Sequence, residues 1–312
     1  MSQPFTPETY EAKGRRTLWL RALTAPVSAI RWTRYLTALH ARVGAATPLA
    51  RALSKPLRAY LRRDFWPPRR LAILRETWDW LETRFAPAFL KRLCDNDDSL
   101  VMEIKARKNS RYGIYIGAAV GAAMQREGEI AIYCARSPQD EKLCRASFSV
   151  ATVDGRKALV IGGIQGPPAT AKREVIDATR EMFGLRPKDA VLLAVRAFAA
   201  EAGLAEVHAV SDARHVLSRL ANTSKFSNYD EYWRERGARC AGPYGYVFEP
   251  LEISGPDGSK REALKCAIVD SVAEFVAANA REGAYRPRPL SAEATSSSAP
   301  GSSMVAGIAQ GS

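Results

Sequence analysis

The stretch EIAIYCARSPQDEKLCRASFSVATVDGRKALVIGGI, residues 129–164, decides the fold. It holds three runs rich in β-branched and aromatic residues, which are typical of strands, at 129–135, 143–153 and 158–164. Between the last two runs, the pair Asp154-Gly155 favours a tight hairpin, because both residue types tolerate the positive φ of such a turn. The stretch therefore predicts an antiparallel meander.

The segments on either side extend this meander into a larger domain. Two further strand-like runs precede it, at 100–104 and 112–116. The patterns after it indicate, in order, helix 170–183, helix 188–202, strand 207–210, helix 229–236, strand 245–253 and helix 261–281. The sequence thus predicts an α+β core at 95–286, in which helices flank a mixed sheet.

The first 94 residues carry almost all of the net positive charge. They hold 18 Lys and Arg against 6 Asp and Glu, in a chain whose net charge is +13. Apolar residues recur at helical spacing from Arg15 to Leu61, and prolines at 26, 48 and 56 divide this part into short helices. A further helix is indicated at 69–93, with an apolar stripe that we expect to pack on the core. We therefore predict a basic helical region at 1–94.

A charge excess confined to one segment indicates an acidic partner. Arg31-Trp32 and Arg34-Tyr35 place arginines beside aromatic rings, which suits an amphipathic helix at a membrane interface. We expect residues 1–63 to bind an anionic membrane surface. The alternatives are a solvated basic face and, as the weaker hypothesis, nucleic-acid binding through residues 1–70.

The composition points to a globular protein of a reducing compartment. Hydrophobic residues make up 46% and charged residues 25% of 312 residues, as in ordinary folded domains. No apolar run reaches the length of about 18 residues that a membrane span needs, and arginines interrupt any signal-peptide core. The five cysteines form no CxxC pair. These features predict a cytoplasmic protein, peripheral at the inner membrane, with a disordered tail at 287–312.

Several short motifs follow one another through the core and together resemble one bacterial family. They are Arg126-Glu127-Gly128-Glu129-Ile130-Ala131, Gly163-Ile164-Gln165-Gly166-Pro167, Gly184-Leu185-Arg186-Pro187-Lys188, Ala209-Val210-Ser211-Asp212, His215 and Tyr229-Asp230-Glu231-Tyr232-Trp233. Their order and spacing resemble the VirK/YbjX family. The resemblance implies a role in virulence, in the display of surface proteins and in resistance to antimicrobial peptides through remodelling of the envelope.

The order of elements in the core is also similar to that of GNAT acyltransferases, which bind acyl-coenzyme A. In those enzymes the loop before a helix offers backbone N–H groups to the pyrophosphate of the cofactor. The matching loop here supplies the candidate cofactor-binding residues Gln165, Gly166, Thr170, Lys172 and Arg173. Two prolines within the loop remove N–H donors, which favours the alternative of a rigid turn.

Four residues are candidate catalytic groups under this analogy. Tyr229 and Tyr232 occupy the region where GNAT enzymes place a tyrosine that protonates the leaving thiolate. Asp212 and His215 follow a buried strand, and the histidine can act as a base near neutral pH. The simpler interpretations are an apolar helix face for the tyrosines and a helix N-cap for the aspartate.

Two classes of function remain open on the sequence. The first is a VirK/YbjX-like factor that maintains the envelope as an acyl-coenzyme A-dependent acyltransferase, acting on a small molecule, a lipid or a protein. The second is a binding module or chaperone of the same fold. No cluster of His, Cys, Asp and Glu has the spacing of metal ligands, so no metal site is predicted.

Overall fold

A computed structural model describes residues 18, 20–120, 124–137, 141–167, 171–204, 206–218, 228–251 and 258–284, and of Lys108 and Glu141 it describes the backbone. The tail predicted to be disordered at 287–312 lies outside the described residues, as does Thr170.

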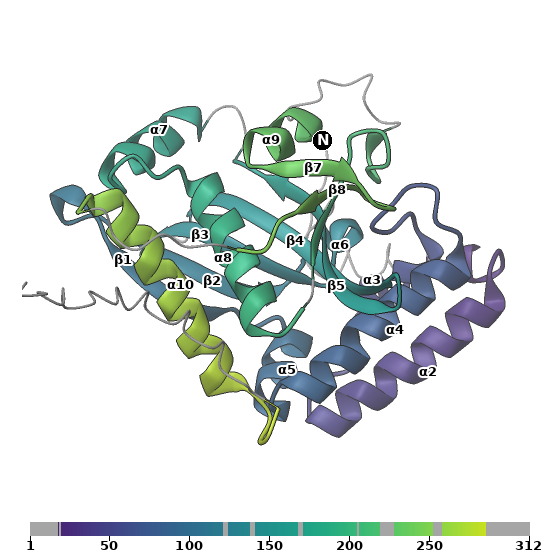
Figure 1. Ribbon diagram of the computed structural model, residues 1–312. Coiled ribbons are helices and arrows are strands. Elements are labelled where there is room, and N and C mark those ends of the chain that lie inside the picture. Colours follow the sequence, from purple (N-terminus) through teal and green to yellow (C-terminus); the bar gives the residue numbers. More distant parts are fainter. Residues whose placement is uncertain are drawn as a thin grey trace, which may run out of the picture.

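A sheet of eight strands forms the centre of the molecule (Figure 1). Its strand order is β1-β2-β3-β4-β5-β6-β8-β7. The strands are β1 (Ser99–Lys105), β2 (Arg111–Ala118), β3 (Ile130–Ser137), β4 (Glu141–Val153), β5 (Arg156–Gln165), β6 (Val207–Val210), β7 (Ala238–Ala241) and β8 (Gly245–Phe248). The first five strands form the antiparallel meander, with Asp154 at φ 47° and Gly155 at φ 77° in the β4–β5 turn. The α+β class predicted from the sequence is confirmed.

β5 and β6 form a parallel pair within the otherwise antiparallel sheet, and the two strands separate before β5 ends. Residues 159–161 of β5 pair with residues 207–209 of β6, while β5 continues to Gln165 along β4. The crossover between these two strands contains α7 (Lys172–Glu181) and α8 (Pro187–Glu201). Beyond Ile161, the β6-facing edge of β5 is therefore open to other groups.

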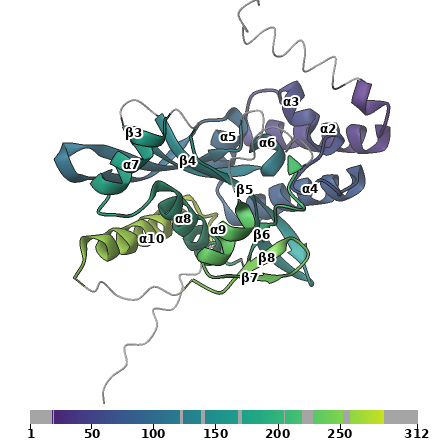
Figure 2. The ribbon, with the colours of Figure 1, turned by 90° about the horizontal axis from the view of Figure 1, so that it is seen from above.

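Helices cover both faces of the sheet, so the molecule has three layers (Figure 2). α8 and α10 (Lys260–Asn279) lie on one face. On the other face lie α4 (Pro67–Arg84), α5 (Pro87–Asp95) and, outside them, α2 (Pro26–Val43). The short elements are α3 (Ala50–Leu53), η1 (Lys55–Leu57), η2 (Arg107–Asn109), α6 (Met124–Glu127) and α9 (Tyr229–Glu235).

The N-terminal helices share one hydrophobic core with the sheet. The apolar stripe expected to be buried between 69 and 93 is buried, from Leu71 at 8% exposed to Leu81 at 0%. Trp32, Leu36 and Leu39 of α2 belong to the same cluster. None of the described helices combines the length and the apolar content needed to cross a bilayer.

The structure corrects three details of the sequence interpretation. The helix predicted at 69–93 is two helices, because Pro87 begins α5 and lacks the N–H that would continue α4. Pro26 begins a continuous 18-residue helix instead of breaking one. The strand predicted at 245–253 ends at Phe248 and pairs with β7, which the sequence interpretation missed.

Candidate functional site

The one-turn helix α6 lies against β5, because three glycines leave room for it. A Cβ atom added to Gly162 would lie 1.9 Å from the carbonyl oxygen of Glu127, and one added to Gly163 would lie 2.5 Å from the Glu127 Cδ. A Cβ atom on Gly128 would lie 2.4 Å from the backbone nitrogen of Phe148. A real side chain does not fit at these distances. Gly128, Gly162 and Gly163 thus permit the Glu127 carboxylate to lie directly on the sheet.

The side chain of Glu127 is fully buried and holds two partners on one oxygen. The exposed fraction of Glu127 is 0%. Gln165 Nε2 donates a hydrogen bond to Glu127 Oε1 at 2.7 Å, and His215 Nε2 lies 3.1 Å from the same atom. Oε2 is buried and has no hydrogen-bond partner among the described residues. A buried carboxylate oxygen with free lone pairs is expensive to maintain, so this atom is the first candidate for a chemical role.

The hydrogen bonds of His215 assign its tautomer. The backbone N–H of Leu217 donates to His215 Nδ1 at 3.3 Å, so the ring proton of the neutral form resides on Nε2. Nε2 therefore donates to Glu127 Oε1. Arg126 holds the segment around His215 in place, since its guanidinium donates to the carbonyl oxygens of Ala59 and Val216, each at 3.2 Å.

Tyr229, the first residue of α9, packs against His215 in a T-shaped arrangement. The two ring centroids are 5.0 Å apart at an interplanar angle of 62°, and Trp233 stacks on Tyr229 at 5.8 Å. Burial raises the pKa of the Tyr229 phenol well above its ordinary value, and the charge of Glu127 adds to this effect. A backbone hydrogen bond from Ile164, on the open edge of β5, opposes the shift. The phenol therefore keeps its proton at physiological pH.

Asp212 positions α9 through its carboxylate. Its carboxylate accepts hydrogen bonds from the backbone N–H groups of Tyr229 at 3.2 Å and Asp230 at 3.3 Å. The Asp230 carboxylate in turn accepts one from the Asp212 N–H at 2.8 Å. The reciprocal arrangement fixes the start of the helix that carries Tyr229.

Tyr232 lies on another face of α9 and contacts α8. Its hydroxyl donates to the carbonyl oxygen of Lys188 at 3.2 Å and approaches Asp189 Oδ1 at 3.3 Å. The Lys188 Nζ lies 3.6 Å from the Tyr232 ring centroid. Burial, and then the charge of Asp189, raise the pKa of Tyr232 above its ordinary value. This tyrosine is therefore separate from the group around Glu127.

The candidate cofactor residues extend from the end of β5 to the start of α7. Gln165 belongs to the Glu127 cluster, as described above. Gly166 is exposed and has open space where a Cβ would lie. Lys172 and Arg173 are exposed, and Arg173 lies 3.9 Å from Asp177. Of the nine candidate residues, the structure brings Gln165, His215 and Tyr229 together.

Comparison with known proteins adds the family. A family model described as a protein of unknown function, DUF535, matches residues 8–258. The chain belongs to the DUF535 family. It is also 27% identical over 137 residues to the uncharacterized protein YbjX of Escherichia coli strain K12. The aligned region covers 42% of this chain and 41% of the relative. These matches confirm the VirK/YbjX resemblance. The chain thus aligns with about two fifths of the length of this curated relative.

Sequence reasoning used the motif Arg126-Glu127-Gly128-Glu129 only for the family resemblance and proposed neither of its glutamates as a functional residue of this DUF535 chain. Glu129 is 4% exposed, and its partners belong to the N-terminal region. Its Oε1 accepts from Lys55 Nζ at 2.6 Å and from the Tyr60 hydroxyl at 3.1 Å, and its Oε2 accepts from Trp78 Nε1 at 2.8 Å. The available signal was two carboxylates at the start of an apolar strand.

Proposed function

We propose that this DUF535 protein is an acyltransferase in which Glu127 is the general base and Tyr229 the general acid. The observation that carries the proposal is the buried Glu127 carboxylate, held on one oxygen by Gln165 and His215, beside a phenol that stays protonated. The order of strands and the early separation of β5 from β6 support a GNAT-like arrangement. The donor substrate of such a reaction is an acyl thioester of coenzyme A.

The proposed roles follow from the hydrogen bonds around each group. Glu127 Oε2, which has free lone pairs, takes the proton of an attacking amine or hydroxyl group. Gln165 and His215 hold Oε1 and fix the direction of Oε2. When the carbon–sulfur bond breaks, the Tyr229 phenol gives its proton to the leaving thiolate. The thioester arm would lie beside Tyr229, at the part of β5 beyond Ile161 that no longer pairs with β6.

Replacing Tyr229 by phenylalanine is expected to lower turnover by about 10²-fold and to leave the binding of coenzyme A unchanged. The variant removes the hydroxyl and keeps the ring contacts with His215 and Trp233. Release of thiol from acetyl-coenzyme A, measured over a panel of amine and hydroxyl acceptors, follows the reaction. Tyr232→Phe is the matched control, since Tyr232 contacts α8. Equal losses in both variants would show that neither phenol acts as the acid.

The buried state of the cluster favours one second candidate, a binding module without catalysis. Glu127, His215 and Tyr229 are 0%, 7% and 5% exposed, as expected for groups that stabilise a fold. In that case the cluster fixes the loops around β5 and β6, and the protein binds its partner elsewhere. Such a protein would not be stabilised by coenzyme A, whereas a ligand of the native state raises the melting temperature by mass action.

We also propose that the N-terminal helices bind an anionic membrane surface and place the enzyme beside envelope precursors. Leu20, Leu23, Val27 and Ile30 are 70%, 79%, 60% and 53% exposed. Val27 and Ile30 are three residues apart on α2, whose Arg31 and Arg34 are exposed as well, whereas Leu20 and Leu23 precede α2. Apolar side chains next to arginines on a surface helix suit the interface of an anionic bilayer. The family resemblance supports the envelope as the place of action.

Ile30→Gln is expected to weaken binding to vesicles of phosphatidylcholine and phosphatidylglycerol in equal parts by about tenfold. Co-sedimentation at low salt measures this binding. Ile176→Gln is the matched control, because Ile176 is 43% exposed on α7. Point variants are preferable to truncation, since Lys55 and Tyr60 anchor the N-terminal region to Glu129. A full-length protein that ignores these vesicles contradicts the membrane proposal.

A further inference from the structure

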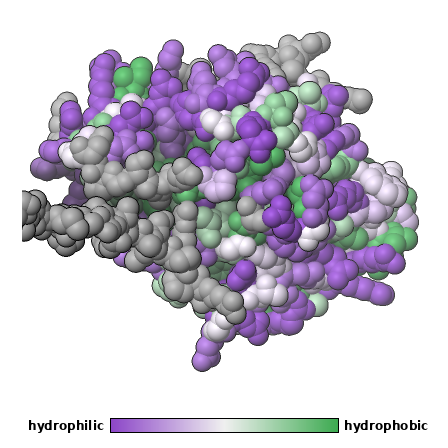
Figure 3. All heavy atoms as spheres, in the orientation of Figure 1, coloured by the Kyte–Doolittle hydropathy of each residue, from purple (hydrophilic) through white to green (hydrophobic). Residues whose placement is uncertain are grey.

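A large cavity lies between α8, α9 and α10, on the face of the molecule shown in Figure 3. Its volume is about 860 Å³, which is within the range of sites for small organic ligands. Tyr229 of α9 belongs to the Glu127 cluster, whereas Glu235 and the adjoining Arg236 line the cavity. The cavity is therefore separate from the candidate acid–base site.

The lining of the cavity is positively charged. Arg186, Arg196, Arg236, Arg261 and Lys265 line it together with three carboxylates, which leaves a net charge of +2. The carboxylates are already engaged: Asp189 lies 2.7 Å and Glu235 3.1 Å from Arg236, and Glu262 lies 2.7 Å from Lys265. Arg186, Arg196 and Arg261 have no carboxylate partner among the described residues.

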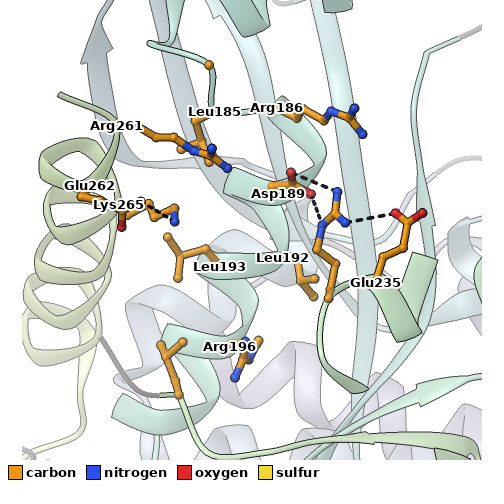
Figure 4. A pocket seen from close by; sticks show the side chains of 13 residues that line it. Leu185, Arg186, Asp189, Leu192, Leu193, Arg196, Glu235, Arg261, Glu262 and Lys265 are labelled. Carbon is orange, nitrogen blue, oxygen red and sulfur yellow. Dashed lines mark hydrogen bonds and ion pairs between the residues drawn. The ribbon is translucent and has the colours of Figure 1, made fainter. Parts of the chain in front are cut away.

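Two of these arginines come from different helices and lie at opposite ends of the cavity. Figure 4 shows Arg261 reaching from α10 toward α8, and Arg196 at the lower end of α8. Arg196 donates to the carbonyl oxygen of Glu249 at 3.0 Å, while its Nε is buried without a hydrogen-bond partner in the part of the chain that the structure describes. Burial also lowers the pKa of Arg196. Arg196 thus places a partly desolvated positive charge at this end of the cavity.

The floor between these charges is apolar. Leu192 is 4% exposed and Leu251 7% exposed. The partly buried side chain of Leu193, on α8, points toward α10 (Figure 4). In Figure 3, hydrophobic atoms are exposed in the middle of this face among hydrophilic ones. An inorganic ion would leave this floor and most of the volume empty. A ligand that matches the lining has one anionic group and an apolar body.

We propose that the cavity binds an amphipathic phosphate monoester, with its phosphate at the end where Arg261 lies and its apolar body on Leu192, Leu193 and Leu251. Guanidinium groups pair with phosphate oxygens in bidentate geometry, which favours a phosphate for a site bordered by several arginines. The same chemistry occurs in soluble metabolites and in lipid headgroups with short chains. The site is independent of acyl transfer, because it shares no described residue with the Glu127 cluster.

Calorimetric titration of the full-length chain with n-hexyl phosphate, and in parallel with inorganic phosphate, tests the site. We expect saturable binding of hexyl phosphate, and binding of inorganic phosphate weaker by about tenfold or more. Arg261→Gln is expected to weaken both ligands by about tenfold, because it removes a charge-assisted contact. Leu193→Ala is expected to weaken hexyl phosphate and to leave inorganic phosphate unchanged.

Arg156→Gln is the matched control, since Arg156 lies at the start of β5 and its side chain is 69% exposed. Arg261 is also exposed, so its substitution does not threaten the fold, and a thermal melt of each variant verifies this.

A wild-type chain that does not bind hexyl phosphate at millimolar concentration overturns the proposal. So does equal weakening by Arg156→Gln and Arg261→Gln. Equal affinity for both phosphates overturns the apolar part and with it the amphipathic ligand. A lysophospholipid with a phosphate headgroup, tested in the same way, distinguishes a lipid from a soluble metabolite.

Discussion

Glu129→Ala is expected to lower the free energy of unfolding by about 3–5 kcal/mol, the range for breaking a buried ion pair from one side. The substitution leaves the Lys55 ammonium, whose side chain is 11% exposed, without its carboxylate. It also removes the acceptor of Trp78 Nε1 and one of two contacts of the Tyr60 hydroxyl, which keeps Ser149 Oγ at 2.6 Å. Because these donors come from η1, the segment after it and α4, the variant loosens the whole N-terminal region from the sheet. Chemical denaturation measures the loss.

Two controls separate the charge from the packing. Glu103→Ala removes an exposed carboxylate, 3.6 Å from Arg111, and is expected to change stability by less than about 1 kcal/mol. The double variant Lys55→Met with Glu129→Leu removes both charges and is expected to be far more stable than Glu129→Ala. A loss for Glu129→Ala as small as that for Glu103→Ala would show that the N-terminal region does not depend on this anchor.

Glu127→Gln is expected to lower turnover by about 10²–10⁴-fold, because the amide cannot accept the proton of the attacking group. The amide is nearly isosteric with the carboxylate, so Gly162 and Gly163 still accommodate it. The melting temperature should therefore change little, and the loss of activity should not come from unfolding. Acceptor-dependent thiol release from acetyl-coenzyme A, together with a thermal melt, measures both properties.

Glu174→Gln is the matched control for this variant. Glu174 lies in the first turn of α7 and also has a buried oxygen without a partner among the described residues. It is not part of the Glu127 cluster in any described contact, so its substitution should leave turnover unchanged. Turnover that survives Glu127→Gln would remove Glu127 from the role of base.

Much of the fold could be predicted because local patterns determine it. The strand at 207–210 matches β6 residue for residue, and the Asp154-Gly155 turn determines the β4–β5 hairpin. β7 was missed because Ala238-Arg239-Cys240-Ala241 contains no β-branched or aromatic residue, and its pairing with β8 forms the strand. The break at Pro87 was missed because the apolar stripe continues through it.

The candidate site was only partly predictable, for a physical reason. Gln165, His215 and Tyr229 belong to recognisable motifs at the ends of elements, where functional groups are common. Glu127 acquires its position through contact with Gly162 and Gly163, some 35 residues later in the chain, and no local pattern reveals such a contact. The same limit explains Tyr232, whose place on α9 beside Asp189 depends on how α9 packs against α8.

The proposed acyl transfer depends first on whether the protein binds acyl-coenzyme A. Isothermal titration of the full-length chain with acetyl-coenzyme A tests this most directly, with the variant Lys172→Ala/Arg173→Ala in parallel. These two side chains are exposed at the start of α7, so their loss should weaken binding without affecting the fold. We predict saturable binding by the wild type and weaker binding by the variant. A wild-type chain that releases no heat of binding at millimolar acetyl-coenzyme A would contradict the account and leave the binding module in its place.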